Sequence, residues 1–155
     1  MHTSGDVIPP ACPVIGEAEI EAAVRVLRSG RVVQGPEVAA FEEEFSAWVD
    51  GRHCVAVNSG TSALHLSLLA LGLGPADEVI VPSFSFAATA NAVRLVGARP
   101  VFADIDPATY CLDPAAVRAA IGPRTAAELP VHLYGHPAAM YDLGALDDTH
   151  GIAVV

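Results

Sequence analysis

The sequence predicts an α/β protein in which a mainly parallel sheet is flanked by helices. From residue 53 onward, short apolar runs of strand length alternate with longer segments of helical periodicity. Glycine and proline residues fall where those helices should begin or end. Strands that alternate with helices along a chain are typical of a parallel sheet covered on both faces.

Two helices are predicted before the first strand. Glu17–Ser29 places its apolar side chains on one stripe and is followed by Gly30, a typical helix end. Pro36–Val49 begins with proline, which favours a first helical turn, and it is followed closely by Gly51. The second helix carries an apolar stripe that we expect to face a core: Val38, Phe41, Phe45 and Trp48.

Five strands and four further helices are predicted after these. The strands are His53–Val57, Glu78–Val81, Pro100–Ala103, Glu128–Leu133 and Ile152–Val155. The helices are Thr61–Leu71, Phe86–Val96, Pro114–Ile121 and Pro137–His150. Asp113 is the expected N-cap of the third of these helices. Glu128 interrupts its apolar run, so its strand is the weakest of the five.

Composition excludes several classes of partner. The chain has 155 residues, with 8 basic against 18 acidic residues and a formal net charge of −10. This balance excludes nucleic acid, whose phosphates require a basic surface, and gives no electrostatic reason to bind an anionic membrane. No apolar run reaches the roughly 18 residues of a membrane span, and the first residues lack a signal-peptide pattern.

Two residue types bear on chemistry. The three cysteines are widely spaced and have no metal-like spacing, which predicts a reduced, cytoplasmic location and no metal site. All eight basic residues are arginines, so this chain cannot perform chemistry that needs a lysine. The last residues, Gly151–Val155, have the pattern of an interior strand, and ligands of open α/β sheets bind beyond the carboxyl ends of strands. We therefore expect a truncated chain with an exposed sheet edge and exposed apolar helix faces.

The most informative stretch is Asn58-Ser59-Gly60-Thr61-Ser62, between a predicted strand and a predicted helix. Free backbone N–H groups and the positive end of the helix dipole meet at such a turn, which favours an anion such as phosphate. Gly60 allows close approach, and the Thr61 and Ser62 hydroxyls can donate hydrogen bonds. The stretch is neither a Gly-Lys phosphate loop nor a GxGxxG dinucleotide turn. An ordinary serine or threonine helix cap is the alternative.

Three further blocks accompany this turn, namely Asp77–Thr89, Gly97–Asp106 and Pro130–Gly135. In this order and spacing the chain resembles the DegT/StrS family of nucleotide-sugar aminotransferases, which depend on pyridoxal 5′-phosphate (PLP). The resemblance runs from about Pro13 to Val155. It implies the N-terminal part of a fold-type-I PLP-dependent transferase large domain. Residues 1–155 would then be a single incomplete domain, with an N-terminal helical segment over 1–51 and the start of the PLP-binding α/β domain over 52–155.

The resemblance gives roles to individual residues. Gly60, Thr61 and Ser62 match the family turn whose amides and hydroxyl hold the PLP phosphate. Phe86 matches the aromatic position that stacks on the pyridine ring, and core packing is its alternative. Thr89, one helical turn further on, is a candidate for the same pocket.

Other candidates are weaker. Gly30–Pro36 resembles the family's substrate-side segment, with an ordinary inter-helix loop as the alternative. His132 and Tyr134 follow a strand whose end faces the cofactor in such folds, although a buried structural histidine is the commoner role. The acidic pairs Asp104 with Asp106, and Asp147 with Asp148, are not expected to be catalytic, since the first reads as a turn and the second lies on an exposed helix.

The implied activity of the full enzyme is transfer of an amino group, from glutamate, to a keto-sugar bound to a nucleotide. Such reactions supply amino sugars for polysaccharides or antibiotics, and the family implies a homodimer. The Schiff-base lysine and the acid that pairs with the pyridinium nitrogen are expected beyond Val155. No catalytic residue is therefore expected in this chain, which we expect to be inactive by itself.

Alternatives stay open at this point. The chain can be a non-catalytic remnant or interaction module that binds PLP weakly or pairs with an intact paralogue. It can belong to a PLP-dependent sugar dehydratase of the same family, in which histidine replaces the lysine, or to another fold-type-I enzyme such as a lyase. The residues that would distinguish these chemistries are expected beyond Val155, and the sequence does not reveal the sugar, the nucleotide or the amino donor.

Overall fold

The computed structural model describes residues 12–155, which form two compact units. The first unit ends at Ala56, and the second runs from Val57 to Val155. None of the helices in residues 12–155 is long and apolar enough to cross a membrane.

The first unit contains the two helices that the sequence predicts. α1 spans Glu17–Ser29 and ends at Gly30, whose φ of 70° is left-handed. α2 spans Pro36–Trp48, with the proline in its first turn. The expectation that the apolar stripe of α2 faces a core is wrong within this unit: Phe41, Phe45 and Trp48 are 55%, 49% and 87% exposed. Neither helix has a buried residue, because a unit of this size is too small to enclose a core.

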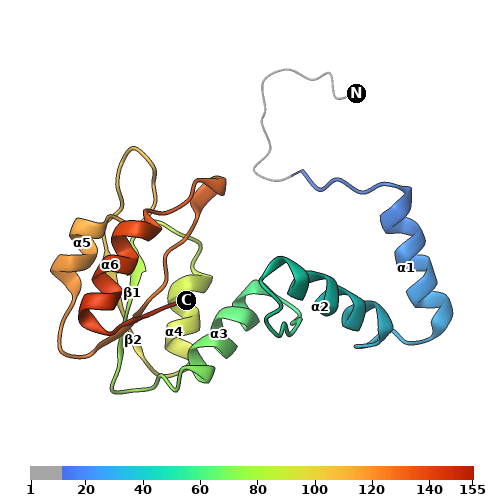
Figure 1. Ribbon diagram of the computed structural model, residues 1–155, viewed down its shortest axis with the longest axis horizontal. Helices are drawn as coiled ribbons and strands as arrows, with labels where there is room; N and C mark the ends of the chain where they lie inside the picture. The colour runs from blue at the N-terminus through green and yellow to red at the C-terminus, as the bar shows by residue number, and fades with distance from the viewer. Residues whose placement is uncertain (1–11) are drawn as a thin grey trace. The chain divides into compact units, whose positions relative to one another are not determined.

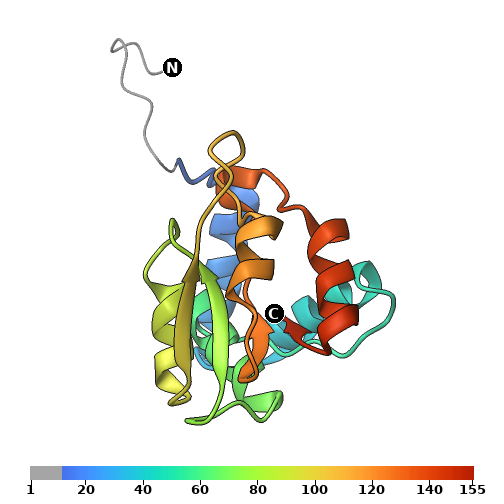
Figure 2. The ribbon, with the colours of Figure 1, turned by 90° about the vertical axis from the view of Figure 1, so that its left-hand side faces the viewer.

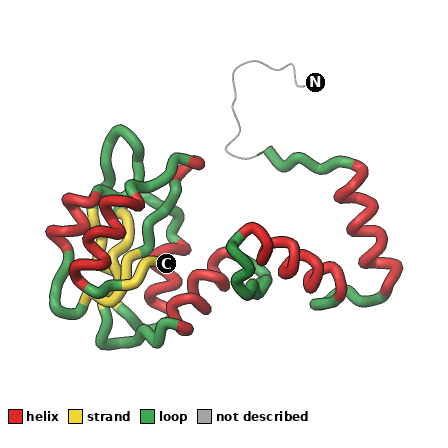
Figure 3. The backbone as a smooth tube through the Cα atoms, in the orientation of Figure 1, coloured by secondary structure: helices red, strands yellow, loops and turns green. Residues whose placement is uncertain are grey.

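The predicted strand His53–Val57 is wrong. These residues have no regular secondary structure (Figure 3), and the Val55 side chain is 79% exposed. A strand needs backbone partners, and no strand of residues 12–155 pairs with this segment. At Ala56, side chains supply the hydrogen-bond partners that a neighbouring strand would provide. The Ala56 N–H donates to Glu42 Oε1 at 2.7 Å, and the Ala56 carbonyl accepts from Gln34 Nε2 at 3.4 Å.

A four-stranded sheet is the centre of the second unit (Figure 1). Its strands are β1 (Glu78–Pro82), β2 (Arg99–Ala103), β3 (Thr125–Glu128) and β4 (Ala153–Val154). They lie in the order β2-β1-β3-β4, and all three pairings are parallel. This confirms the predicted fold class. β1 is central, and all five of its residues are buried.

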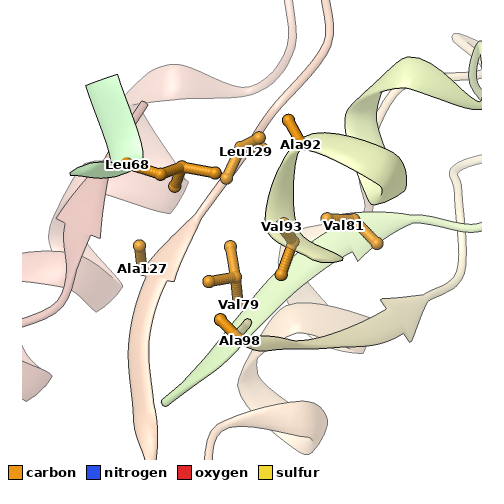
Figure 4. Close-up of a cluster of buried hydrophobic side chains, with 8 residues drawn as sticks. All are labelled: Leu68, Val79, Val81, Ala92, Val93, Ala98, Ala127 and Leu129. Atoms are coloured by element: carbon orange, nitrogen blue, oxygen red, sulfur yellow. The ribbon is translucent and has the colours of Figure 1, made fainter. Parts of the chain in front are cut away.

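Helices cover both faces of this sheet (Figure 2). They are α3 (Gly60–Ala70), α4 (Ala88–Leu95), α5 (Pro114–Ala120) and α6 (Met140–His150). Because side chains alternate along a strand, Val79 and Val81 of β1 join the buried cluster under α3 and α4 (Figure 4). Ile80 points the other way and joins the cluster under α5 and α6.

Helix boundaries follow the predicted signals with two shifts. Asp113 caps α5 as predicted, because its Oδ1 accepts the Ala115 N–H at 2.9 Å. α4 begins at Ala88, so Phe86 lies in the bend before the helix and not within it. α6 begins at Met140, after Pro137.

β3 ends where the sequence predicts that it begins. After Glu128 one more ladder bond forms, from the Leu129 N–H to the Ile80 carbonyl at 2.9 Å. Pro130 then has no N–H to donate, so the strand stops. The chain continues into a short 3₁₀ turn, Leu133–Gly135, in place of the predicted strand end.

The expectation that Asp147 is exposed on its helix is wrong. Asp147 is 5% exposed and Glu128 is fully buried, and neither carboxylate has a hydrogen-bond partner among residues 12–155. Asp147 stands one turn after Leu143 on the buried side of α6. Glu128 pairs in register with Ile80, so it faces the same cluster.

Candidate functional site

A hollow of about 700 Å³ lies in the second unit, and we call it the α3 hollow. Its mainly apolar walls come from the start of α3, the bend before α4 and the segment after β3. The bend and the last segment follow the carboxyl ends of two neighbouring strands, β1 and β3. Ligands of parallel α/β sheets bind at this edge.

The start of α3 offers backbone donors to the hollow. Ser59 is the N-cap, and its Oγ accepts the Ser62 N–H at 3.1 Å. The Gly60 and Thr61 amides, which begin the helix, have no acceptor among residues 12–155. Both residues line the hollow. Two free N–H groups at the positive end of a helix dipole favour an anion there.

The hydroxyl groups next to these amides differ in availability. Thr61 lines the hollow, and its hydroxyl has no hydrogen-bond partner within the described part of the chain. Ser62 does not line the hollow, and its Oγ donates to Asn58 Oδ1 at 2.7 Å. The amides of Gly60 and Thr61 and the Thr61 hydroxyl are therefore the groups free to bind a ligand. The role that the family resemblance gives to Ser62 stays a prediction.

Gly60 leaves open space at the start of α3. A Cβ built on Gly60 would meet no heavy atom within 4 Å. Because Gly60 lines the hollow, a side chain there would enter the ligand space without displacing protein atoms. The turn therefore has room for a phosphate beside the two free amides.

Phe86 supplies an aromatic face to the same hollow. Its side chain is 80% exposed, so the alternative of a core phenylalanine does not hold in this unit. The Thr89 N–H donates to the Phe86 carbonyl at 3.1 Å and fixes the backbone of the bend. An exposed ring beside an apolar hollow can stack on a flat aromatic ligand.

His132 reaches the hollow from the segment after β3. Its Nδ1 accepts the Ala138 N–H at 3.0 Å, so in the neutral imidazole the proton is on Nε2. The predicted alternative of a buried structural histidine is half right, because the ring makes a structural hydrogen bond but its side chain is exposed.

The structure does not bring the other candidates to the α3 hollow. Of the segment Gly30–Pro36, residues 31–36 border a separate hollow within the first unit. Tyr134 is 86% exposed and does not line the α3 hollow. Asp106 forms the predicted turn, since its Oδ1 accepts the Ala108 N–H at 2.8 Å.

Sequence reasoning missed Ser85. This residue and Thr89 both line the hollow, and Ser85 Oγ lies 3.0 Å from Thr89 Oγ1. The sequence signal for this contact was the presence of two hydroxyl residues four positions apart, with an aromatic residue between them. The bond also required α4 to begin at Ala88, which the sequence placed two residues earlier.

The second unit combines a parallel sheet with a mainly apolar hollow at its carboxyl edge. Free helix N–H groups and an exposed aromatic ring border this hollow. Such an α/β protein is suited to a phosphorylated aromatic ligand. The chain belongs to the DegT/DnrJ/EryC1/StrS aminotransferase family, whose model matches residues 13–155. This confirms the resemblance seen in the sequence.

Individual relatives agree with the family match. The erythromycin biosynthesis sensory transduction protein EryC1 of Saccharopolyspora erythraea is 57% identical over 87% of this chain and 37% of its own length. The dTDP-3-amino-3,4,6-trideoxy-α-D-glucose transaminase of Streptomyces venezuelae is 52% identical over 89% of this chain and 37% of its own length. The solved structure of Bacillus subtilis NtdA with bound cofactor PMP has a TM-score of 0.84 and 40% identity, covering 90% of this chain and 33% of that one.

The chain spans about 37% of the length of these two curated relatives. The solved structures that it matches include the aminotransferase from Psychrobacter cryohalolentis, of which the chain covers 36%.

Proposed function

We propose that this chain is the N-terminal part of a PLP-dependent aminotransferase that acts on nucleotide-linked keto-sugars. The observation that carries the proposal is the α3 hollow, where the free Gly60 and Thr61 amides and the exposed Phe86 ring border one space. A phosphate and a flat aromatic ring are the two recognisable parts of PLP. The family match and the nucleotide-sugar transaminase among the relatives support the substrate class.

The residues present fit the cofactor. Gly60 and Thr61 would hold its phosphate through two N–H groups and one hydroxyl, and Phe86 would cover one face of its ring. His132 would present a hydrogen-bond donor from the opposite segment of the hollow. PLP, when bound, supplies the electron sink that lets a proton leave the carbon bearing the amino group. Ser62 would support the turn through the hydrogen bond that its Oγ donates to Asn58 Oδ1.

The groups that move the proton are not in this chain. Every basic residue here is an arginine, so the lysine that such chemistry requires is supplied by residues outside this sequence, and so is the acidic partner of the pyridinium nitrogen. The 155-residue chain by itself is then inactive in amino transfer. The proposal includes glutamate as the amino donor, a homodimer as the complete enzyme, and the cytoplasm as its location.

The proposal is tested on the native protein of the source cells. Its intact mass is measured first, and the purified protein is then assayed with PLP, glutamate and a set of dTDP- and UDP-linked keto-sugars. We expect a mass of more than twice the 16.0 kDa of this chain, together with an amino-sugar product. A native mass near 16.0 kDa without amino transfer would favour the remnant or interaction module. A product that loses a hydroxyl without gaining nitrogen would favour the dehydratase.

Thr61→Val is expected to weaken PLP binding about tenfold, because it removes one hydrogen bond to a charged phosphate while keeping the size of the side chain. Thr61→Ser, which keeps the hydroxyl, is the matched control and should bind as the unsubstituted protein does. The measurement is an equilibrium titration followed by the PLP absorption band. Equal affinity of the valine and serine variants would show that the hydroxyl does not contact the phosphate.

A further inference from the structure

The Phe86 ring has little side-chain support in the second unit. It is 80% exposed, and the aromatic pair found nearby joins Phe84 to Tyr110 and leaves Phe86 out. Because no packing holds the exposed ring, the backbone alone sets where the ring begins, through the direction of the Phe86 Cα–Cβ bond. The question is therefore what fixes the bend that presents this ring.

Two bonds close that bend. The Thr89 N–H donates to the Phe86 carbonyl at 3.1 Å, and Ser85 Oγ lies within hydrogen-bond distance of Thr89 Oγ1, at 3.0 Å. The hydroxyl bond joins the residue before Phe86 to the residue three positions after it. Residues 85–89 thus form a short loop around Phe86, which one backbone hydrogen bond and one side-chain hydrogen bond close.

Thr89 is the rigid end of this loop. Its side chain is 6% exposed, and it lies in the first turn of α4, whose Ala92 and Val93 are fully buried in the core. Ser85 is half-buried and lies outside any helix or strand. The bond therefore ties the irregular side of the bend to an element that the core holds in place.

We propose that Thr89 is a positioning residue, which fixes the bend that presents Phe86 to the α3 hollow through its hydroxyl bond to Ser85. The inference deepens the proposed function and rests on it for the identity of the ligand. One of the two hydroxyls donates to the other, so the accepting hydroxyl keeps its own hydrogen free at the wall of the hollow.

The first arm of the test uses the protein without cofactor. Amide hydrogen exchange of residue 89 is measured by NMR in the unsubstituted chain and in Thr89→Val, Ser85→Ala, Thr89→Ser and the Val–Ala double variant. We expect the exchange of this amide to become roughly three- to tenfold faster in both single variants and to return in Thr89→Ser. Thr149→Val is the matched control, because Thr149 Oγ1 donates to the Ala145 carbonyl within α6.

The second arm titrates the same proteins with PLP and records the circular dichroism of its absorption band. Thr89→Val and Ser85→Ala should each weaken PLP binding about fivefold and reduce the dichroism of the bound cofactor. The double variant should bind no more weakly than either single variant, because one bond is lost in all three.

Each outcome decides the inference. Unchanged exchange in Thr89→Val, or effects of the two single variants that add in the double variant, would overturn it. Faster exchange with unchanged PLP affinity would overturn the link to the hollow. If the unsubstituted protein binds no PLP, the proposed function fails, while the exchange arm still shows whether the hydroxyl bond orders the bend.

Discussion

Glu128→Leu is expected to stabilise the protein by about 3 kcal/mol at pH 8. The Glu128 carboxylate is fully buried without a hydrogen-bond partner among residues 12–155, and it faces an apolar cluster. Burial, together with the nearby Asp147 carboxylate, raises the pKa of Glu128 to about 7 from 4.5. A shift of this size corresponds to about 3 kcal/mol of destabilisation when the group is ionised. A leucine of similar volume removes that cost.

The sign of the pH dependence follows from the raised pKa. Below about pH 4.5 Glu128 is protonated in both the folded and the unfolded state, so its titration costs nothing. Between pH 4.5 and 7 only the unfolded state releases the proton, so stability falls as the pH rises. Above pH 7 the loss is complete. Burial also raises the pKa of Asp147, with Asp148 as a second cause, so its contribution has the same sign.

Urea unfolding at several pH values between 5 and 8 measures this effect. The unsubstituted protein should lose stability across the range, and Glu128→Leu should lose much less, retaining only the part that belongs to Asp147. Asp142→Asn, at an exposed position of the same helix as Asp147, is the control and should shift stability by less than about 1 kcal/mol at any pH. A constant stability of the unsubstituted protein from pH 5 to 8 would contradict the argument.

Asp147 also shows which part of the fold the sequence could have predicted. It lies four residues after Leu143 and next to Leu146, so helical periodicity alone places it on the apolar side of α6. Its charge outweighed that periodicity in the prediction of an exposed residue. The parallel sheet and the helices were predictable because Val79–Pro82 of β1 is a continuous apolar run and the helix ends carry strong signals such as Asp113.

The remaining errors depend on tertiary contacts. His53–Val57 is as apolar as a buried strand, but no strand of the described residues pairs with it. Of the candidate site, Gly60, Thr61 and Phe86 were predictable through the family motif, and they line one hollow. The Ser85–Thr89 bond was not predictable, because it depends on the residue at which α4 begins.

Gly60→Asp is expected to abolish useful PLP binding, with an affinity at least roughly 100-fold lower. The position has no heavy atom within 4 Å of a Cβ, so the substitution fits the fold. It is also the first residue of α3, where an acidic side chain stabilises a helix. The same carboxylate would lie against the phosphate of the ligand, and two like charges about 4 Å apart repel by about 4 kcal/mol near a protein surface.

This substitution separates ligand binding from stability, because the two should move in opposite directions. The thermal unfolding midpoint of Gly60→Asp should equal or exceed that of the unsubstituted protein while the PLP titration fails. Gly122→Asp is the matched control: its Cβ also meets no heavy atom within 4 Å, and the residue does not line the α3 hollow. It makes the same change in net charge and should leave PLP affinity unaltered. If Gly60→Asp binds PLP normally, the phosphate does not lie at the start of α3, and the proposed cofactor site is wrong.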